Sequence, residues 1–245
     1  MDRLDGQVAL ISGSSSGIGE QVARDLAEAG AHVVVNSSRS VEAGRQLAES
    51  LPTESIYVQA DISREEDDKA LVAAAVEKFG RLDILVNNAG WTTRVPHNDM
   101  EALSNEILFK TFEVNVYGTW WLSKAAMPHL EKAERGCIVN VSSVAGVRAI
   151  GSSTAYGMAK AAMNNLTLDL ARNFRSVRVN AVAPGLVATP WTADWDDLHQ
   201  GVAAMIPAGR SATPEDVSKA ILACIDNQYV TGQVFVVDGG TTIVM

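Results

Sequence analysis

The feature of this sequence that most restricts its fold is a regular alternation of short apolar runs with longer amphipathic segments. Seven runs rich in valine and isoleucine are predicted to be strands, at residues 7–12, 31–36, 55–60, 82–87, 137–142, 177–182 and 233–238. Several are apolar on both faces, which is typical of parallel strands covered by helices on both sides. The alternation therefore predicts an α/β fold with one doubly wound, parallel, seven-stranded sheet.

The amphipathic segments carry recognisable helix ends. GEQVARDLAEAG and REEDDKALVAAAVEKFG end at Gly30 and Gly80, where glycine is the preferred residue just beyond a helix. Residues 61–63, followed by Glu65, supply capping and acidic first-turn signals for the second segment. We therefore expect capped helices between the strands.

The chain reads as one domain over residues 1–245, because no repeat, low-complexity tract or linker interrupts the alternation. Its least regular stretches are 91–110 and 186–213. The four histidines lie in unrelated places without ligand spacing, so no metal site is predicted.

Composition narrows the class of protein. Hydrophobic residues make up 47% and charged residues 20% of the chain, and no apolar run approaches transmembrane length. The formal net charge of −9 argues against a general nucleic-acid or anionic-membrane surface, but not against a small anionic ligand in a local pocket. The start MDRLDGQVAL has no signal-peptide pattern, and Cys137 and Cys224 are interpreted as core thiols. These features lead us to expect a cytoplasmic protein.

Three glycines, Gly13, Gly17 and Gly19, lie between the first predicted strand and its helix. Glycine allows a tight turn and a close approach of backbone to a pyrophosphate, and the helix N-terminus that follows favours an anion. The spacing is GxxxGxG rather than the commonest fingerprint, GxGxxG. At the first turn of an α/β chain, it favours dinucleotide binding over a structural turn.

The end of the second predicted strand bears on the choice of cofactor. An acidic residue there would bind the two ribose hydroxyls of NAD, and a basic residue would accommodate the 2′-phosphate of NADP. This chain has Ser37, Ser38 and Arg39, with no carboxylate to repel a phosphate. We therefore expect NADP(H), with NAD(H) as the alternative; Arg39 would otherwise simply begin a solvated helix.

Tyr156 and Lys160 lie four positions apart and share one face of a predicted helix. Reduction of a carbonyl by hydride requires a proton donor at the oxygen. An unperturbed tyrosine, with a pKa of about 10, works poorly as a base near neutrality. A neighbouring ammonium and a positive nicotinamide are expected to lower that pKa. Many surface helices carry the same spacing, so the pair by itself does not distinguish catalysis from a solvated helix face.

Six motifs in order resemble the short-chain dehydrogenase/reductase family, in the single-domain branch that includes 3-oxoacyl-carrier-protein reductases. The motifs are SGSSSGIG (12–19), NNAG (87–90), VN with Asn115, VNVSS ending at Ser143, YGMAK (156–160) and APGLVATP (183–190). The resemblance covers nearly the whole chain and implies a Rossmann fold. Ser12 replaces the more usual threonine, and the segment between Gly90 and Asn115 is slightly long, which bears on the substrate pocket.

The resemblance implies a catalytic role for four residues. Tyr156 matches the proton donor and acceptor, and Lys160 matches its partner, which also holds the nicotinamide ribose. Ser143 matches the serine whose hydroxyl polarises the carbonyl oxygen. Asn115 matches the asparagine that positions a water linking the lysine to solvent.

The resemblance also implies cofactor contacts from five segments, besides Tyr156 and Lys160. They are Gly13, Ser15, Ser16, Gly17, Ile18 and Gly19 in the glycine turn; Ser37, Ser38 and Arg39 at the adenosine ribose; Asp61 and Ile62 beside the adenine; Asn88, Ala89 and Gly90 along the nicotinamide side; and Pro184, Gly185, Val187 and Thr189 at the carboxamide. Asp61 would serve equally well as a helix cap, and Asn87 is expected to stabilise the central sheet.

The substrate pocket is expected near the two irregular stretches. Candidates for its lining are Trp91, Thr92, Arg94, Val144, Arg148, Ser153, Trp191 and Trp195. In this family the stretch matching 186–213 forms a mobile lid, which would gate access and exclude water. His97, in the RVPHND loop, either contacts substrate or is simply exposed.

These features predict an NADP(H)-preferring oxidoreductase that interconverts a small-molecule carbonyl compound and a secondary alcohol. The resemblance adds a homotetramer, with helices around 111–131 and 155–172 and the final strand at the interfaces. The alternatives are an NAD(H)-dependent alcohol or sugar dehydrogenase and a non-enzymatic nucleotide sensor. A sensor would not need all four catalytic residues. An epimerase or dehydratase acting on nucleotide sugars usually carries a larger C-terminal domain.

Overall fold

Seven parallel strands form the central sheet of the computed structural model, which describes residues 3–245. They are β1 (Val8–Ile11), β2 (His32–Ser37), β3 (Ser55–Gln59), β4 (Ile84–Asn87), β5 (Cys137–Val141), β6 (Arg178–Pro184) and β7 (Val234–Val237). Each of the seven predicted strands is present, and the predicted doubly wound α/β class is confirmed. Met1 and Asp2, which begin the MDRLDGQVAL segment, lie outside the described residues.

The strand order is β3-β2-β1-β4-β5-β6-β7, so the order reverses between β1 and β4. Leu10 of β1 pairs with Val34 of β2 on one side and with Leu85 of β4 on the other. All three side chains are buried, because helices cover both faces of the sheet. In such sheets, ligands bind outside the carboxyl ends of the strands at the point where the order reverses.

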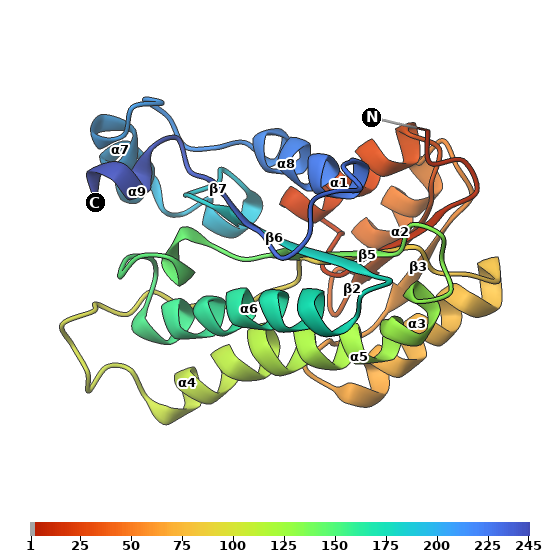
Figure 1. Cartoon of the computed structure of the whole chain (residues 1–245). Coiled ribbons are helices and arrows are strands. Elements are labelled where there is room, and N and C mark those ends of the chain that lie inside the picture. The colour runs from red at the N-terminus through yellow and green to blue at the C-terminus, as the bar shows by residue number, and fades with distance from the viewer. Residues whose placement is uncertain (1–2) are drawn as a thin grey trace.

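Helices lie in one layer on each face of the sheet (Figure 1). On one face are α1 (Gly17–Glu28), α2 (Val41–Ser50) and α8 (Pro214–Asp226); on the other are α3 (Glu65–Phe79), α5 (Thr119–Leu130) and α6 (Thr154–Asn173). The remaining helices are α4 (Asn105–Phe112), α7 (Asp196–Met205), α9 (Thr241–Val244), the π-helix η1 (Glu113–Gly118) and the 3₁₀ turns η2 (Val144–Gly146) and η3 (Pro190–Thr192). Each layer buries its own apolar cluster against the sheet.

The predicted helix ends are confirmed at the C-termini. Gly30 and Gly80 have φ values of 103° and 76°, the left-handed conformation that glycine adopts without strain. The predicted cap of α3 is wrong, because its N-cap is Arg64 and has no side-chain cap bond. Asp61 Oδ1 instead accepts hydrogen bonds from Ser63 N (3.0 Å) and Oγ (2.8 Å) in the turn before the helix.

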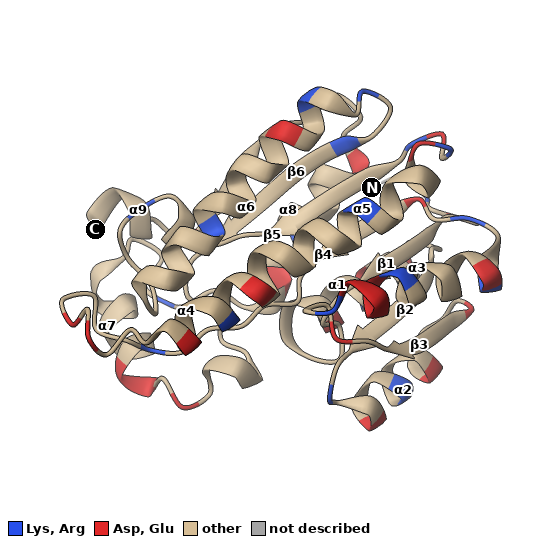
Figure 2. Ribbon diagram, turned by 90° about the horizontal axis from the view of Figure 1, so that it is seen from below, with Lys and Arg blue, Asp and Glu red and all other residues tan. Residues whose placement is uncertain are grey.

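The helical face shown in Figure 2 is weakly charged along α5 and α6. Exposed apolar side chains lie on or just before these helices and on the edge strand β7, among them Tyr117, Trp120, Met158, Leu168 and Phe235. Cys137 and Cys224 are buried and unbridged, as predicted for core thiols. Among the helices of residues 3–245, none is both long and apolar enough to cross a membrane.

Candidate active site

Three neighbouring segments at the carboxyl ends of the strands carry the four predicted catalytic residues. Ser143 follows β5 and is the N-cap of η2, where its Oγ accepts a hydrogen bond from Ala145 N (3.2 Å). Tyr156 and Lys160 lie in the first two turns of α6. Asn115 lies in η1, which contacts α6. Three segments that are separate in sequence, spanning residues 115 to 160, therefore carry the four residues at this end of the sheet.

Lys160 is a buried cation, with 2% of its surface exposed. Its Nζ donates to Val141 O (2.8 Å) at the end of β5 and lies 5.5 Å from the centre of the Tyr156 ring. Burial lowers the pKa of Lys160 to about 7, because an ammonium loses hydration in the interior. The lysine therefore titrates near neutrality in the protein alone.

The Tyr156 phenol behaves differently from the sequence expectation. Burial raises its pKa to about 12, although a hydrogen bond with the Ser143 side chain acts in the opposite direction. We expected Lys160 to lower this pKa. The protein's own groups do the reverse, because the phenolate would lose its hydration and Lys160 is itself only partly charged near pH 7. Tyr156 consequently keeps its proton throughout the neutral range.

Asn115 links the catalytic helices to the segment after β4. Its Nδ2 donates to Trp91 O (2.7 Å) and Thr111 O (2.8 Å), while Trp91 N donates to its Oδ1 (3.4 Å). The side chain is fully buried. It lies on a π-helical segment, an arrangement that recurs at functional sites. Nothing in the sequence pattern predicted this segment, because it continues the same helical periodicity as α4 and α5.

The glycine turn presents bare backbone to neighbouring segments. Gly13 and Gly17 have φ values of 62° and 60°. A Cβ on Gly13 would lie 2.8 Å from Ala89 Cα, and one on Gly17 would lie 3.2 Å from Thr189 Cγ2. A Cβ on Gly19 would lie 2.5 Å from Asn88 Nδ2. The turn thus brings together the predicted cofactor segments at Gly13–Gly19, Asn88–Ala89 and Thr189.

A cluster of three polar side chains holds this turn: Asn88, a predicted cofactor residue, and Ser12 and Asn36, to which the sequence assigned no role. Ser12 Oγ accepts from Asn88 N and Ala89 N, both at 3.1 Å. Asn88 Nδ2 donates back to Ser12 O (3.0 Å) and Gly13 O (2.9 Å). Asn36 Oδ1 accepts from Gly13 N (3.2 Å), while its Nδ2 donates to Ala60 O (3.1 Å). The role of Asn36 could have been suspected from the sequence, because it is a polar residue directly after the valine run of β2.

The predicted ribose-reading segment separates into a buried part and an exposed part. Ser37 is buried, and its Oγ lies 2.9 Å from the phenol oxygen of Tyr57 on β3. Ser38 and Arg39 are exposed. Within residues 3–245, no side-chain hydrogen bond or ion pair of Arg39 is found.

The other predicted cofactor residues lie at the ends of β3, β4 and β6 or in the segments that follow these strands. Asp61 is half-buried, and Ile62 packs against Gly118 of η1. Pro184 ends β6, and Gly185 N donates to Val237 O (3.0 Å). Val187 is buried and bridges to Ala212. A Cβ on Gly90 would lie 2.9 Å from Asn115 Oδ1 and 3.8 Å from both Lys160 Nζ and Trp191 Cη2. A Cβ at these glycines would collide with neighbouring segments, so the backbone stays bare, which fits the close approach of a dinucleotide.

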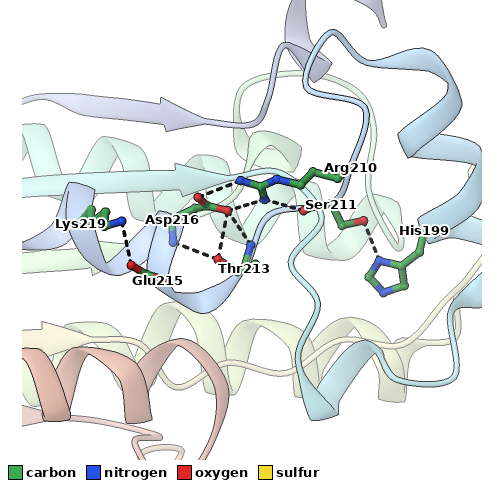
Figure 3. Close-up of polar contacts among 7 residues, drawn as sticks. All are labelled: His199, Arg210, Ser211, Thr213, Glu215, Asp216 and Lys219. Atoms are coloured by element: carbon green, nitrogen blue, oxygen red, sulfur yellow. Dashed lines mark hydrogen bonds and ion pairs between the residues drawn. The ribbon is translucent and has the colours of Figure 1, made fainter.

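The predicted lid, residues 186–213, is held by contacts within it and by an ion pair from its C-terminal end to α8. His199 Nδ1 lies 2.7 Å from Ser211 Oγ (Figure 3), and its Nε2 lies 3.1 Å from Thr192 O. Arg210 donates from both Nη atoms to Asp216 of α8, at 2.6 and 3.1 Å (Figure 3). These contacts hold the lid as a loop that leaves β6 and returns to α8.

A second set of contacts joins the predicted pocket segments. Arg94 makes a bidentate ion pair with Asp197 of α7, at 3.2 and 3.0 Å. The Oγ1 of Thr92 lies 2.6 Å from Ser152 Oγ. His97 Nε2 lies 3.0 Å from Gly151 O. Within the described residues, no group of three or more His, Cys, Asp or Glu side chains could hold a metal ion.

Comparisons with known proteins agree with this architecture. A family model described as enoyl-(acyl carrier protein) reductase matches residues 13–242. The chain is 48% identical to a Streptomyces violaceoruber protein assigned as ketoacyl reductase 2 of the granaticin polyketide synthase, covering 98% of this chain and 97% of that one. It is 36% identical to the 3-oxoacyl-[acyl-carrier-protein] reductase FabG of Thermotoga maritima, covering 98% and 100%.

A solved 7α-hydroxysteroid dehydrogenase, complexed with NADH and 7-oxo glycochenodeoxycholic acid, has a TM-score of 0.89 and 32% identity. The similarity covers 97% of this chain and 95% of that one. The matches extend over the sheet, the glycine turn and the catalytic segments alike. The chain belongs to the short-chain dehydrogenase/reductase family of NAD(P)-dependent oxidoreductases, which interconvert alcohols and carbonyl compounds.

Proposed function

We propose that the protein is an NADP(H)-preferring reductase of ketones in which Tyr156 donates the proton. Ser143 would hydrogen-bond the carbonyl oxygen alongside Tyr156 and orient it. Lys160 would hold the nicotinamide ribose, and Asn115 would fix the segment that carries Gly90. These roles give each polar group of the site a task in one reaction.

The observation that carries this proposal is the burial of Lys160. A buried ammonium is costly unless it is paired, and Lys160 has only a backbone carbonyl as a short hydrogen-bond partner among the described residues. Its Nζ lies 3.8 Å from the position that a Cβ on Gly90 would take, and 5.5 Å from the centre of the Tyr156 ring. A purely structural lysine would reach solvent, so its placement supports a ligand that uses the charge.

The phenol of Tyr156 supports a role as an acid. With a pKa of about 12, it holds its proton at neutral pH and can give it to an alkoxide that develops on the substrate. A bound nicotinamide cofactor supplies or accepts the hydride and, when oxidised, brings a positive charge. Ser143, at the N-cap of η2, is held at the end of β5 where it meets the same oxygen. The net reaction is ketone, hydride and proton giving secondary alcohol.

The cofactor would lie across the point where the sheet order reverses. The glycine turn and the N-terminus of α1 would hold the pyrophosphate, and Asp61 and Ile62 would flank the adenine. Asn88, Ala89 and Gly90, with Pro184, Gly185, Val187 and Thr189, would line the nicotinamide side. Exposed Arg39, with Ser38 beside it, supports a 2′-phosphate and hence NADP(H).

Two observations favour the alternative cofactor, NAD(H). The similar 7α-hydroxysteroid dehydrogenase is complexed with NADH. In addition, the hydroxyl of Ser37 faces Tyr57 rather than standing free. A direct comparison of the two cofactors therefore belongs to the test of this proposal.

The proposal extends to the lid and to assembly. Residues 186–213 would form the mobile part of the single domain, opening for substrate and closing to exclude water. Exposed apolar side chains on η1, α5, α6 and β7 support a homotetramer. The buried, unbridged Cys137 and Cys224 support a reducing, cytoplasmic location.

The test uses Tyr156→Phe, which keeps the ring and removes the proton donor. We expect kcat for reduction of ketones to fall about 10²–10⁴-fold, while the Kd of the cofactor changes little. Tyr229→Phe is the matched control, because Tyr229 is 98% exposed and follows α8, away from the crevice. Near wild-type kcat in Tyr156→Phe would exclude Tyr156 as the donor.

A further inference from the structure

Trp191 is a large aromatic residue near Gly90. Among residues 3–245, its ring stacks on no other aromatic ring. It lies on η3, at the start of the lid, and is 48% exposed. Its Cη2 and Lys160 Nζ both lie 3.8 Å from the position of a Cβ on Gly90. One edge of the indole therefore lies close to Gly90, while much of the ring faces solvent. An exposed apolar surface at the mouth of a crevice is typical of a ligand contact.

Two further tryptophans lie on neighbouring segments, and one of them, Trp91, packs against the apolar core. Trp91 directly follows Gly90, and both of its backbone polar groups are held by Asn115. Trp195 belongs to the lid, and its ring lies 5.8 Å from the guanidinium carbon of Arg94. The ion pair of Arg94 with Asp197 therefore joins the segment after Gly90 to the lid, and of these three tryptophans only Trp191 is exposed.

The polar groups around this entrance are engaged with one another. Arg94 is paired in bidentate fashion with Asp197. Thr92 is hydrogen-bonded to Ser152, and His97 to Gly151 O. An anionic carrier or carboxylate at the entrance would have to break these contacts to gain a cationic partner. Among these groups the one cation, Arg94, is already paired, and the exposed apolar surface beside them is the indole of Trp191.

We propose that the substrate is a neutral, ring-bearing ketone and that Trp191 determines this preference by stacking against the ring. The inference rests on the proposed ketone reductase function and specifies its substrate class. A rigid ring offers a flat face to the indole and loses little conformational entropy on binding, whereas a flexible chain loses more. The carbonyl oxygen then lies at Tyr156 and Ser143, with the ring against the lid.

The test compares two neutral ketones with ten carbons each, bicyclic 2-tetralone and linear 2-decanone. We expect wild type to prefer 2-tetralone in kcat/KM. Trp191→Ala should lower kcat/KM for 2-tetralone about tenfold or more, as expected for the loss of a stacked, desolvated ring. It should change the value for 2-decanone less than about threefold, while Trp191→Phe restores most of the preference. The exposed Tyr229→Ala serves as the control and should change neither value.

Binding separates this inference from the catalytic proposal. Calorimetric titration of 2-tetralone into cofactor-loaded Tyr156→Phe measures ring binding without turnover. Binding that is retained there and lost on adding Trp191→Ala supports the inference even if Tyr156 proves not to be the donor. The inference is overturned if wild type prefers 2-decanone, if Trp191→Ala reduces both ketones equally, or if 2-tetralone does not bind.

Discussion

The hydroxyl of Ser37 lies 2.9 Å from the phenol oxygen of Tyr57, on the strand next to its own. This contact turns Ser37 into the interior and leaves Ser38 and Arg39 at the surface, where β2 ends. The segment expected to distinguish the two cofactors therefore has an inner hydroxyl with a partner and an exposed outer guanidinium. We therefore expect the cofactor preference to depend chiefly on Arg39.

Arg39→Ala is expected to reduce the preference for NADPH over NADH. A charge-assisted contact to a phosphate contributes on the order of 1.5–3 kcal/mol, or about ten- to a hundredfold in affinity. Ser37→Asp should reverse the preference, because a carboxylate repels the 2′-phosphate and binds free ribose hydroxyls. The measurement is kcat/KM with each cofactor, with the exposed Arg45→Ala on α2 as the control. A wild-type preference for NADH, or an unchanged ratio in Arg39→Ala, would assign the site to NAD.

Lys160→Met is expected to stabilise the cofactor-free protein while abolishing activity. Burial lowers the folded-state pKa of Lys160 to about 7, below the ordinary value of 10.5. Between these values the unfolded chain binds a proton that the folded chain has released, so the free energy of unfolding rises with pH. Methionine carries no charge to bury, so the free energy of unfolding should rise by about 1–3 kcal/mol at pH 7 and below.

This prediction is checked by urea denaturation of both proteins at pH 6.5 and 9.5. The stability advantage of Lys160→Met should shrink at the higher pH, because the wild-type lysine is then neutral in the folded state. An advantage of equal size at both pH values would argue against titration of this lysine. A loss of stability at pH 6.5 would show that its bond to Val141 O outweighs its burial.

Asp68→Asn is expected to stabilise the fold increasingly as the pH rises. Asp68 on α3 is fully buried, and neither carboxylate oxygen has a hydrogen-bond partner among the described residues. Burial, together with the nearby carboxylates of Asp67, Asp61 and Glu65, raises its pKa to about 8. Between about pH 4 and 8 the folded state holds a proton that the unfolded state has lost, so wild-type stability falls across this interval.

Asp68→Asn cannot titrate, so its stability does not fall in this way. Its free energy of unfolding should exceed that of wild type by about 1–3 kcal/mol at pH 8, and by less at pH 5. Asp67→Asn is the matched control, because Asp67 Oδ2 accepts a hydrogen bond from Asp61 N (3.0 Å). That variant should be neutral or less stable. Denaturation midpoints at the two pH values measure both effects, and a pH-independent gain in Asp68→Asn would contradict the argument.

The sequence by itself determined the strands, the class of sheet and the order of the catalytic motifs. Val- and Ile-rich runs bounded by turn residues are a local signal, and strands buried on both faces have few alternatives. The helix ends at Gly30 and Gly80 were also predicted from the sequence, because glycine adopts the left-handed conformation beyond a helix without strain. The pairing of Tyr156 with Lys160 followed from helical periodicity alone.

Only the tertiary structure decided the electrostatics of the site and the assembly of its walls. The pKa of Tyr156 is raised rather than lowered, because burial depends on every segment packed around the phenol. The ion pair of Arg94 with Asp197 joins residues 103 positions apart. Nor does any sequence period reveal that Trp191 reaches Gly90, because a loop places its side chains through long-range packing. Local signals specify elements, whereas contacts distant in sequence specify the charge, burial and shape on which the chemistry depends.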